Sequence, residues 1–149
     1  MSRAAGWGRA AATLAVVLVA DQATKALAVA RIERGEEVNV FFAIDLTNTR
    51  NRGVAFGALQ GSATVVGVLI AAALVLLLAY FAFNASRPHL WLPVGLLLGG
   101  AVGNLVDRAR EGAVIDFIDP TFWPAFNLAD ASIVIGVLAL LYVVEGKRE

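Results

Sequence analysis

The sequence predicts an all-α membrane protein: a bundle of four transmembrane helices, with a small β-platform outside the membrane in the first long loop. Of its 149 residues, 59% are hydrophobic and 16% are charged, whereas soluble domains contain roughly 45–50% apolar residues. The mean hydropathy is +0.75. Four stretches are apolar enough to cross a hydrocarbon core of about 30 Å, which takes about 20 helical residues.

We expect these spans at about residues 10–30, 63–83, 90–106 and 128–144. The first is apolar as far as Ala20 and then carries Asp21 and Lys25. The second is uninterrupted, the third is rich in leucine and glycine, and the fourth is uncharged except for Asp130. Too few residues remain for a second compact domain, so we expect residues 1–149 to form a single integral membrane domain.

The first span has an alternative interpretation as a secretory signal peptide. Arg3 and Arg9 would form its basic region, and Ala28 to Ala30 would form a small-residue cleavage site. Asp21 and Lys25 argue against this interpretation, because they would interrupt the segment just before the cut.

Residues 36–58 are predicted to form the β-platform. Apolar residues alternate with other residues from Val38 to Leu46, and this period of two is typical of a half-buried strand. The stretch NTRNRG, residues 48–53, has the composition of a polar turn, and Val54 resumes the apolar pattern. We therefore expect either a simple hairpin on the membrane surface or a platform that covers a site, with Asn51 reaching a ligand.

Charge and composition exclude several classes of function. The 12 basic and 12 acidic residues give no net charge, so no basic stripe is available for a nucleic acid. The chain has no cysteine, which excludes disulfides and cysteine-based nucleophiles or metal sites. The single histidine, His89, falls at the opposite end of the spans from most polar residues, so neither a zinc site nor a histidine triad is expected.

Alternating spans bring most of the intramembrane polar residues to one face of the membrane. They come from the ends of three spans, and ionisable groups within spans usually mark a functional site. The residues are Asp21, Lys25, Asn104, Asp107, Arg108, Asn127 and Asp130. Basic residues lie on both sides of the membrane, so the positive-inside rule assigns no orientation.

Structural roles would also explain several of these residues. Asp21 and Lys25 have the i, i+4 spacing of a helical ion pair. Gly95, Gly99 and Gly103 have the spacing that lets membrane helices approach closely. Asn127 and Asp130 resemble a capping box at the start of the fourth span.

Capping does not explain Asp116, which lies in the apolar run from Val114 to Ile118. Burying a lone carboxylate there costs several kcal/mol, about 2–7 on common scales for an uncompensated polar group. Two carboxylates held close together can share one proton near neutrality, because like charges at short range do not both ionise readily. One aspartate then acts as a base on water while the protonated one polarises a carbonyl, as in aspartic proteases.

Five motifs resemble those of the bacterial lipoprotein signal peptidases (signal peptidase II), an aspartyl peptidase family. They cover almost the whole chain, in the order that the family has. The motifs are DQATK from Asp21, NRGVAF from Asn51, GGAVGNLVDR from Gly99, VIDF from Val114 and PAFNLADASIVIG from Pro124.

The resemblance implies a bacterial inner-membrane protein with four spans, cytoplasmic termini and an active site at the periplasmic face, under the first periplasmic loop. It implies a diacylglyceryl-modified prolipoprotein as substrate, cut on the N-terminal side of the lipidated cysteine. Asp116 and Asp130 correspond to the catalytic pair. The supporting positions carry over to Asp21, Lys25, Asn51, Gly100, Asn104, Arg108 and Asn127. No metal or organic cofactor is implied, and we expect a monomer surrounded by membrane lipids.

Two other functions are compatible with such a chain. A small carrier or proton relay would also gather intramembrane acids and bases, but it would need polar groups that continue across the membrane. A non-catalytic assembly factor would use the glycine face of the third span and would tolerate the loss of either aspartate.

Overall fold

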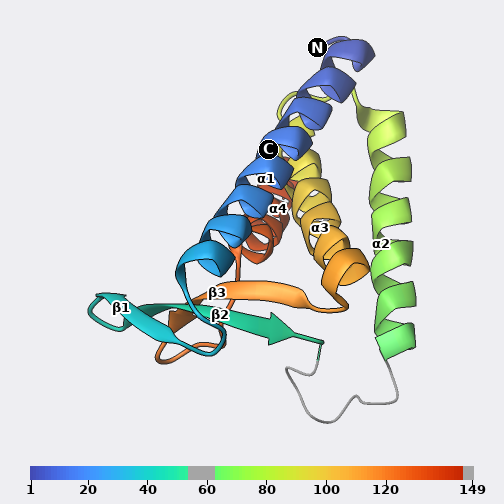
Figure 1. Ribbon diagram of the computed structural model, residues 1–149. Coiled ribbons are helices and arrows are strands. Elements are labelled where there is room, and N and C mark those ends of the chain that lie inside the picture. Colours follow the sequence, from blue (N-terminus) through green and yellow to red (C-terminus); the bar gives the residue numbers. More distant parts are fainter. Residues whose placement is uncertain (54–62, 146–149) are drawn as a thin grey trace.

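The computed structural model describes residues 1–53 and 63–145, and within them the chain is mostly helical (Figure 1). The helices are α1 (Arg3–Arg31), α2 (Ala63–Asn84), α3 (Trp91–Glu111) and α4 (Leu128–Glu145). The strands β1 (Glu37–Phe41), β2 (Ile44–Asn51) and β3 (Val114–Pro120) form one antiparallel sheet in the order β1-β2-β3. This sheet lies across one end of the helices, and the N-terminus lies at the other end (Figure 1).

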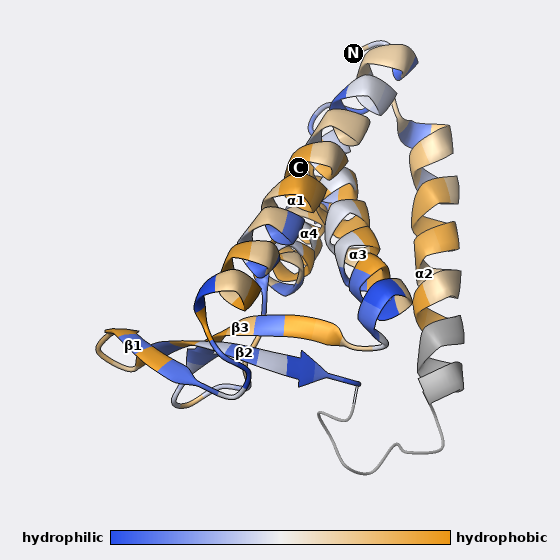
Figure 2. Cartoon of the chain, in the orientation of Figure 1, coloured by the Kyte–Doolittle hydropathy of each residue, from blue (hydrophilic) through white to orange (hydrophobic). Residues whose placement is uncertain are grey.

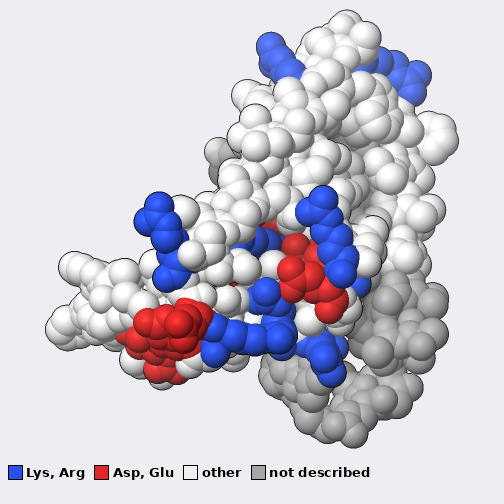
Figure 3. Space-filling view, in the orientation of Figure 1, with Lys and Arg blue, Asp and Glu red and all other residues white. Residues whose placement is uncertain are grey.

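Among the described residues, α1 and α4 are long and apolar enough to cross a membrane. The described apolar part of α2, Leu69–Asn84, is shorter. Apolar residues dominate the helices, whereas β2 is mostly hydrophilic (Figure 2). On the face drawn in Figure 3, charged side chains gather at the sheet and near the N-terminus, with an uncharged zone between them. This distribution fits an integral membrane protein.

Local capping explains where α1 begins and where α3 ends. The Ser2 hydroxyl accepts a hydrogen bond from the backbone N–H of Ala5 at 3.2 Å, which satisfies a donor in the first turn of α1. Gly112 follows α3 with φ 68° and donates its N–H to the Arg108 carbonyl at 3.0 Å. Glycine adopts this left-handed conformation without steric cost, so the chain turns directly from α3 into β3.

Glycines bring α3 close to both α1 and α4, which confirms the packing interpretation of the glycine spacing. A Cβ on Gly95 would lie 2.5 Å from Cβ of Thr13, and one on Gly99 would lie 2.7 Å from Cβ of Val17, both on α1. Helix α1 therefore packs on α3 as part of the fold, which argues against a cleaved signal peptide.

Replacing Gly100 with alanine is expected to destabilise the contact between α3 and α4. The new Cβ would lie 2.5 Å from the Ala129 carbonyl oxygen, and overpacking of this kind costs about 1–3 kcal/mol. The matched control is Gly8→Ala, because no atom lies within 4 Å of the new Cβ and alanine is the better helix former. Thermal unfolding in detergent measures both variants. An unchanged melting temperature for Gly100→Ala would contradict this packing.

The hairpin differs from the prediction in two respects. Its turn lies at Phe42 and Ala43, whereas Asn48 to Asn51 continue β2 and do not form a turn. Strand β1 is exposed along its whole length and is not half-buried. Its tip carries Phe42, which is 94% exposed and has a positive φ of 46°. The predicted platform residues 54–58 lie outside the described residues.

The predicted helical fold with a small β-platform is confirmed in its helical character and its sheet, but the prediction placed the platform in residues 36–58 alone and missed β3. Val114–Pro120 pairs with β2, and Thr49 lies opposite Asp116. The apolar run that includes Val114 and Ile115 suits a strand that is buried against the helix ends. The sheet therefore draws on two separate segments of the chain, and it carries one of the two predicted catalytic residues.

Candidate active site

Polar side chains from α1, α3, α4 and the sheet meet at the sheet end of the helices. Six of the seven polar residues that the sequence analysis assigned to helix ends lie in one hydrogen-bonded network, and Asp116 and Asn51 join it from the strands. The joined residues are Asp21, Lys25, Asn51, Asn104, Asp107, Asp116, Asn127 and Asp130.

Asp116 lies on β3 and is only 2% exposed. Its two carboxylate oxygens each accept a hydrogen bond from an amide group. Asn51 Nδ2 donates to Oδ2 at 3.0 Å, and Asn127 Nδ2 donates to Oδ1 at 2.8 Å. The Thr49 hydroxyl donates to the Asp116 backbone carbonyl at 3.1 Å, which ties this point of β3 to β2.

Asp130 lies in the first turn of α4 and is half-buried. Asn104 Nδ2 donates to its Oδ1 at 2.8 Å, and the backbone N–H of Asn127 donates to its Oδ2 at 3.3 Å. In return, the backbone N–H of Asp130 donates to Asn127 Oδ1 at 2.9 Å. These reciprocal bonds confirm the predicted capping box.

The fully buried side chain of Asn127 connects the two aspartates. Its Nδ2 lies 2.8 Å from Asp116 Oδ1, 3.1 Å from Asn104 Oδ1 and 3.2 Å from the Ile115 carbonyl oxygen. Its Oδ1 accepts from Asp130 as described above. Asn127 therefore holds the start of α4 against β3, with its side chain bonded to the Asp116 carboxylate and its backbone N–H bonded to the Asp130 carboxylate.

The pKa of Asp116 is raised from 3.8 to about 6. Burial is the largest cause, and the charge of Asp130 raises the pKa further. Hydrogen bonds from Asn51 and Asn127 and the charge of Lys25 lower it, but they do not offset the burial. Asp116 therefore keeps its proton to higher pH than an exposed aspartate does.

Lys25 is buried between two carboxylates. Its Nζ lies 2.8 Å from Asp21 Oδ2, 2.7 Å from Asp107 Oδ2 and 3.0 Å from Asn104 Oδ1. These contacts use all three donors of the ammonium group. Asp21 also accepts from the backbone N–H of Ala129 at 2.9 Å, so the predicted helical ion pair is in fact part of a larger network that reaches α4.

Glycines make room for this network. A Cβ on Gly103 would lie 2.6 Å from Asp21 Oδ2, and one on Gly100 would meet the backbone next to Asp130. Within residues 1–53 and 63–145, no buried side-chain nitrogen or oxygen lacks a hydrogen-bond partner. In the same ranges no group of three or more acidic or histidine side chains could hold a metal ion.

Arg108 is the predicted site residue that this network leaves out. Its side chain is exposed, and within the part of the chain that the structure describes it makes neither a hydrogen bond nor an ion pair. The neighbouring residue Asp107 is buried instead.

Sequence reasoning did not assign a supporting role to Asp107 or Gln22. Gln22 Nε2 donates to Asp107 Oδ1 at 2.9 Å and lies 3.2 Å from Asp21 Oδ2. One signal was available for Asp107, because it continues the four-residue spacing of Gly99 and Gly103 and so lies on the face of α3 that packs against α1.

Comparison with known proteins gives consistent results. The family model described as "Signal peptidase (SPase) II" matches residues 13–144. The lipoprotein signal peptidase of Moorella thermoacetica is 44% identical over 131 residues, which are 85% of this chain and 86% of that protein. The lipoprotein signal peptidase of Syntrophomonas wolfei is 37% identical over 146 residues, covering 96% and 95% of the two chains.

A solved structure described as a bacterial membrane enzyme superposes with a TM-score of 0.80 at 31% identity, covering 95% of each chain. A second structure of the same description has a TM-score of 0.79 at 32% identity. Sequence motifs, fold and relatives therefore agree, and the chain belongs to the signal peptidase II family, the membrane proteases of lipoprotein processing.

Proposed function

We propose that this chain is an aspartyl endopeptidase that removes the signal peptide from diacylglyceryl-modified prolipoproteins, cutting on the N-terminal side of the lipidated cysteine. Asp116 and Asp130 are its catalytic pair. The observation that carries the proposal is that two carboxyl groups from distant segments, β3 and α4, both accept hydrogen bonds from one buried residue, Asn127. Its side-chain amide donates to Asp116 and its backbone N–H donates to Asp130.

The surroundings of the two aspartates suggest different roles for them. Burial favours the protonated form of Asp116, whose pKa is about 6. Asp130 is half-buried, whereas Asp116 is only 2% exposed, so Asp130 is the more accessible of the two to a water molecule. Asp130 is thus the general base and Asp116 the general acid.

The reaction then proceeds in two steps. Asp130 takes a proton from water as the water oxygen bonds to the scissile carbonyl carbon, and Asp116 donates its proton to the carbonyl oxygen. The C–N bond of the resulting diol then breaks. Asp130 passes its proton to the leaving amine of the lipidated cysteine, and Asp116 recovers its proton as the carboxylic acid product forms.

The exposed surface beside Asp130 suits a lipidated substrate. Val134 and Leu138 follow Asp130 at i+4 and i+8, so they lie on the same face of α4, and they are exposed. This apolar stripe leads along α4 from the half-buried carboxylate. A diacylglyceryl group lying on it would bring the adjacent peptide bond to the aspartates, after lateral diffusion within the bilayer.

Cleavage of matched peptides tests the proposal. The purified full-length chain in detergent is incubated with a precursor peptide that carries a diacylglyceryl cysteine and with the same peptide carrying free cysteine. We expect mass spectrometry to detect cleavage before the modified cysteine only. Equal cleavage of the two peptides, or a cut at another bond, would refute the assigned substrate.

We further propose that the chain crosses the bacterial inner membrane four times, as a monomer, with cytoplasmic termini and the sheet on the periplasmic side. The cysteine-free sequence makes a direct test possible, because an introduced cysteine is the only thiol. In spheroplasts, an impermeant maleimide should label Phe42→Cys at the sheet. It should label Ala4→Cys only after the membrane is permeabilised. The reverse pattern would invert the topology.

The roles of the aspartates predict how activity depends on pH. Asp116 must keep its proton, so kcat/KM should fall as pH rises through about 6. The hydrogen bond from Asn51 lowers the pKa of Asp116, so Asn51→Ala should move this fall to higher pH. Asn39→Ala is the matched control, since the Asn39 side chain donates to Asp45 and the Phe42 carbonyl on the exposed hairpin. A fall at unchanged or lower pH in Asn51→Ala would contradict the assignment of the acid.

A further inference from the structure

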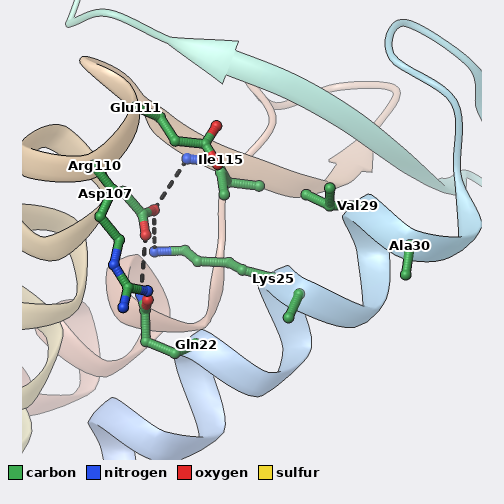
Figure 4. A pocket seen from close by; sticks show the side chains of 9 residues that line it. Gln22, Lys25, Val29, Ala30, Asp107, Arg110, Glu111 and Ile115 are labelled. Carbon is green, nitrogen blue, oxygen red and sulfur yellow. Dashed lines mark hydrogen bonds and ion pairs between the residues drawn. The ribbon is translucent and has the colours of Figure 1, made fainter.

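A cavity of about 350 Å³ lies between the C-terminal halves of α1 and α3 and strand β3 (Figure 4). Its lining includes Gln22, Lys25, Asp107, Arg110, Glu111 and Ile115. Neither Asp116 nor Asp130 lines it. The cavity therefore approaches the site through the groups that support it.

Asp107 is a lining residue of this cavity that makes three internal contacts. Its Oδ2 lies 2.7 Å from Lys25 Nζ and accepts a hydrogen bond from the backbone N–H of Ile115 at 3.1 Å. Its Oδ1 accepts from Gln22 at 2.9 Å. Figure 4 shows these three contacts converging on the one carboxylate.

The contact with Lys25 leads to Asp130. Lys25 donates to Asn104 Oδ1 at 3.0 Å, which fixes which end of that amide faces α1. The Asn104 Nδ2 group must then point away from Lys25, and it donates to Asp130 Oδ1 at 2.8 Å. A displaced Lys25 would remove one of the two donors to Asn104 Oδ1, leaving only Asn127 Nδ2, and would loosen the amide that donates to Asp130 Oδ1.

The contact with Ile115 leads to Asp116. Ile115 immediately precedes Asp116 on β3, and its carbonyl accepts from Asn127 Nδ2 at 3.2 Å. Asp107 therefore accepts a hydrogen bond from the backbone N–H of Ile115. The carbonyl of the same residue accepts from the side chain of Asn127, which contacts both aspartates. On β3 this hydrogen bond sets how close Asp116 lies to α4.

We infer that Asp107 is a positioning residue that keeps the two catalytic aspartates in register, one through Lys25 and Asn104 and the other through the backbone of Ile115. This inference rests on the proposed function. A counterion role alone would not require the bond to Ile115, and Asp21 already pairs with Lys25 at 2.8 Å. Asp107 touches neither the water nor the peptide in the proposed reaction.

Steady-state kinetics of Asp107→Ala test the inference with the lipidated precursor peptide. Because small displacements of catalytic groups cost up to about 100-fold in rate, we expect kcat to fall about 10- to 100-fold. KM should stay within about twofold, since binding of the lipid and peptide is not altered. Asp107→Asn keeps an acceptor for Lys25 and Ile115, so it should retain more activity than the alanine variant.

Chemical rescue distinguishes positioning from a general loss of structure. Removing the carboxylate from Asp107 leaves a space continuous with the cavity, so formate at tens of millimolar should raise kcat of Asp107→Ala severalfold while chloride at equal ionic strength does not. Asp21→Ala is the matched control for rescue, because Asp21 does not line the cavity. Glu111→Gln is the matched control for the kinetics, because Glu111 lines the same cavity but pairs with Arg50 on the surface.

All rates are divided by the folded fraction, measured by near-ultraviolet circular dichroism. If Asp107→Ala does not fold, Asp107→Ser decides, because its shorter side chain stays polar but cannot serve both Lys25 and Ile115, and an unchanged kcat in that variant would overturn the inference. Equal rescue of Asp21→Ala by formate, or a lower rate explained entirely by the folded fraction, would also overturn it. Failure of the proposed function looks different, because the unmodified chain would then not cleave the lipidated peptide at all.

Discussion

Replacing either Asp116 or Asp130 with asparagine is expected to lower kcat for a lipidated precursor peptide by about 10²- to 10⁴-fold. Asparagine cannot take a proton from water, and it cannot donate an acidic proton to the carbonyl oxygen. An asparagine at position 116 can still accept from one of the Nδ2 groups of Asn51 and Asn127, but its own Nδ2 faces the other, so one hydrogen bond is lost, which costs about 1 kcal/mol. Loss of activity should therefore accompany only a modest loss of stability.

The control for these variants is Asp119→Asn. Asp119 lies three residues further along β3, opposite Asp45, and bonds neither catalytic residue. The Asp119→Asn replacement removes one of two carboxylates that face each other across the strands, and kcat should stay within about twofold of that of the unmodified chain. Cleavage rates are compared with the folded fraction and with binding of the lipidated peptide. Substantial cleavage by Asp116→Asn or by Asp130→Asn would refute the two-aspartate mechanism.

Replacing Lys25 with methionine is expected to have the largest effect on stability, a loss of about 3–5 kcal/mol. Lys25 is 1% exposed, and its partners Asp21 and Asp107 are 0% and 3% exposed. Without the ammonium group, two carboxylates would remain buried with no counterion. Removing only the cation costs more stability than removing the cation and both anions together, because the uncompensated anions then stay buried away from water.

Unfolding of the variants in detergent measures this loss. The combined replacement Asp21→Asn, Lys25→Met and Asp107→Asn removes the charges together and should recover part of the lost stability. Arg50→Met is the matched surface control, because Arg50 and Glu111 are 13% and 40% exposed and such pairs contribute about 0–1 kcal/mol. Equal losses for Lys25→Met and Arg50→Met would show that the buried group contributes no more than a surface pair.

The sequence by itself determined the helices and several of their local contacts. The expected spans 10–30, 63–83 and 128–144 lie within the bounds of α1, α2 and α4, and the expected span 90–106 begins one residue before α3. The ion pair of Asp21 with Lys25 and the capping box of Asn127 with Asp130 also followed from spacing alone. These features depend on residues within one turn of each other, so local geometry was sufficient.

Only the tertiary structure decided which residues complete the site. Strand β3 forms because β2, more than sixty residues earlier in the chain, supplies its hydrogen bonds, and no local pattern around Asp116 indicates that partner. Spacing alone allowed either Asp107 or Arg108 to face the site, and the packing of α3 against α1 buries Asp107 and exposes Arg108. Contacts between distant segments set the burial of a side chain, and here burial decides which polar groups support the catalytic pair.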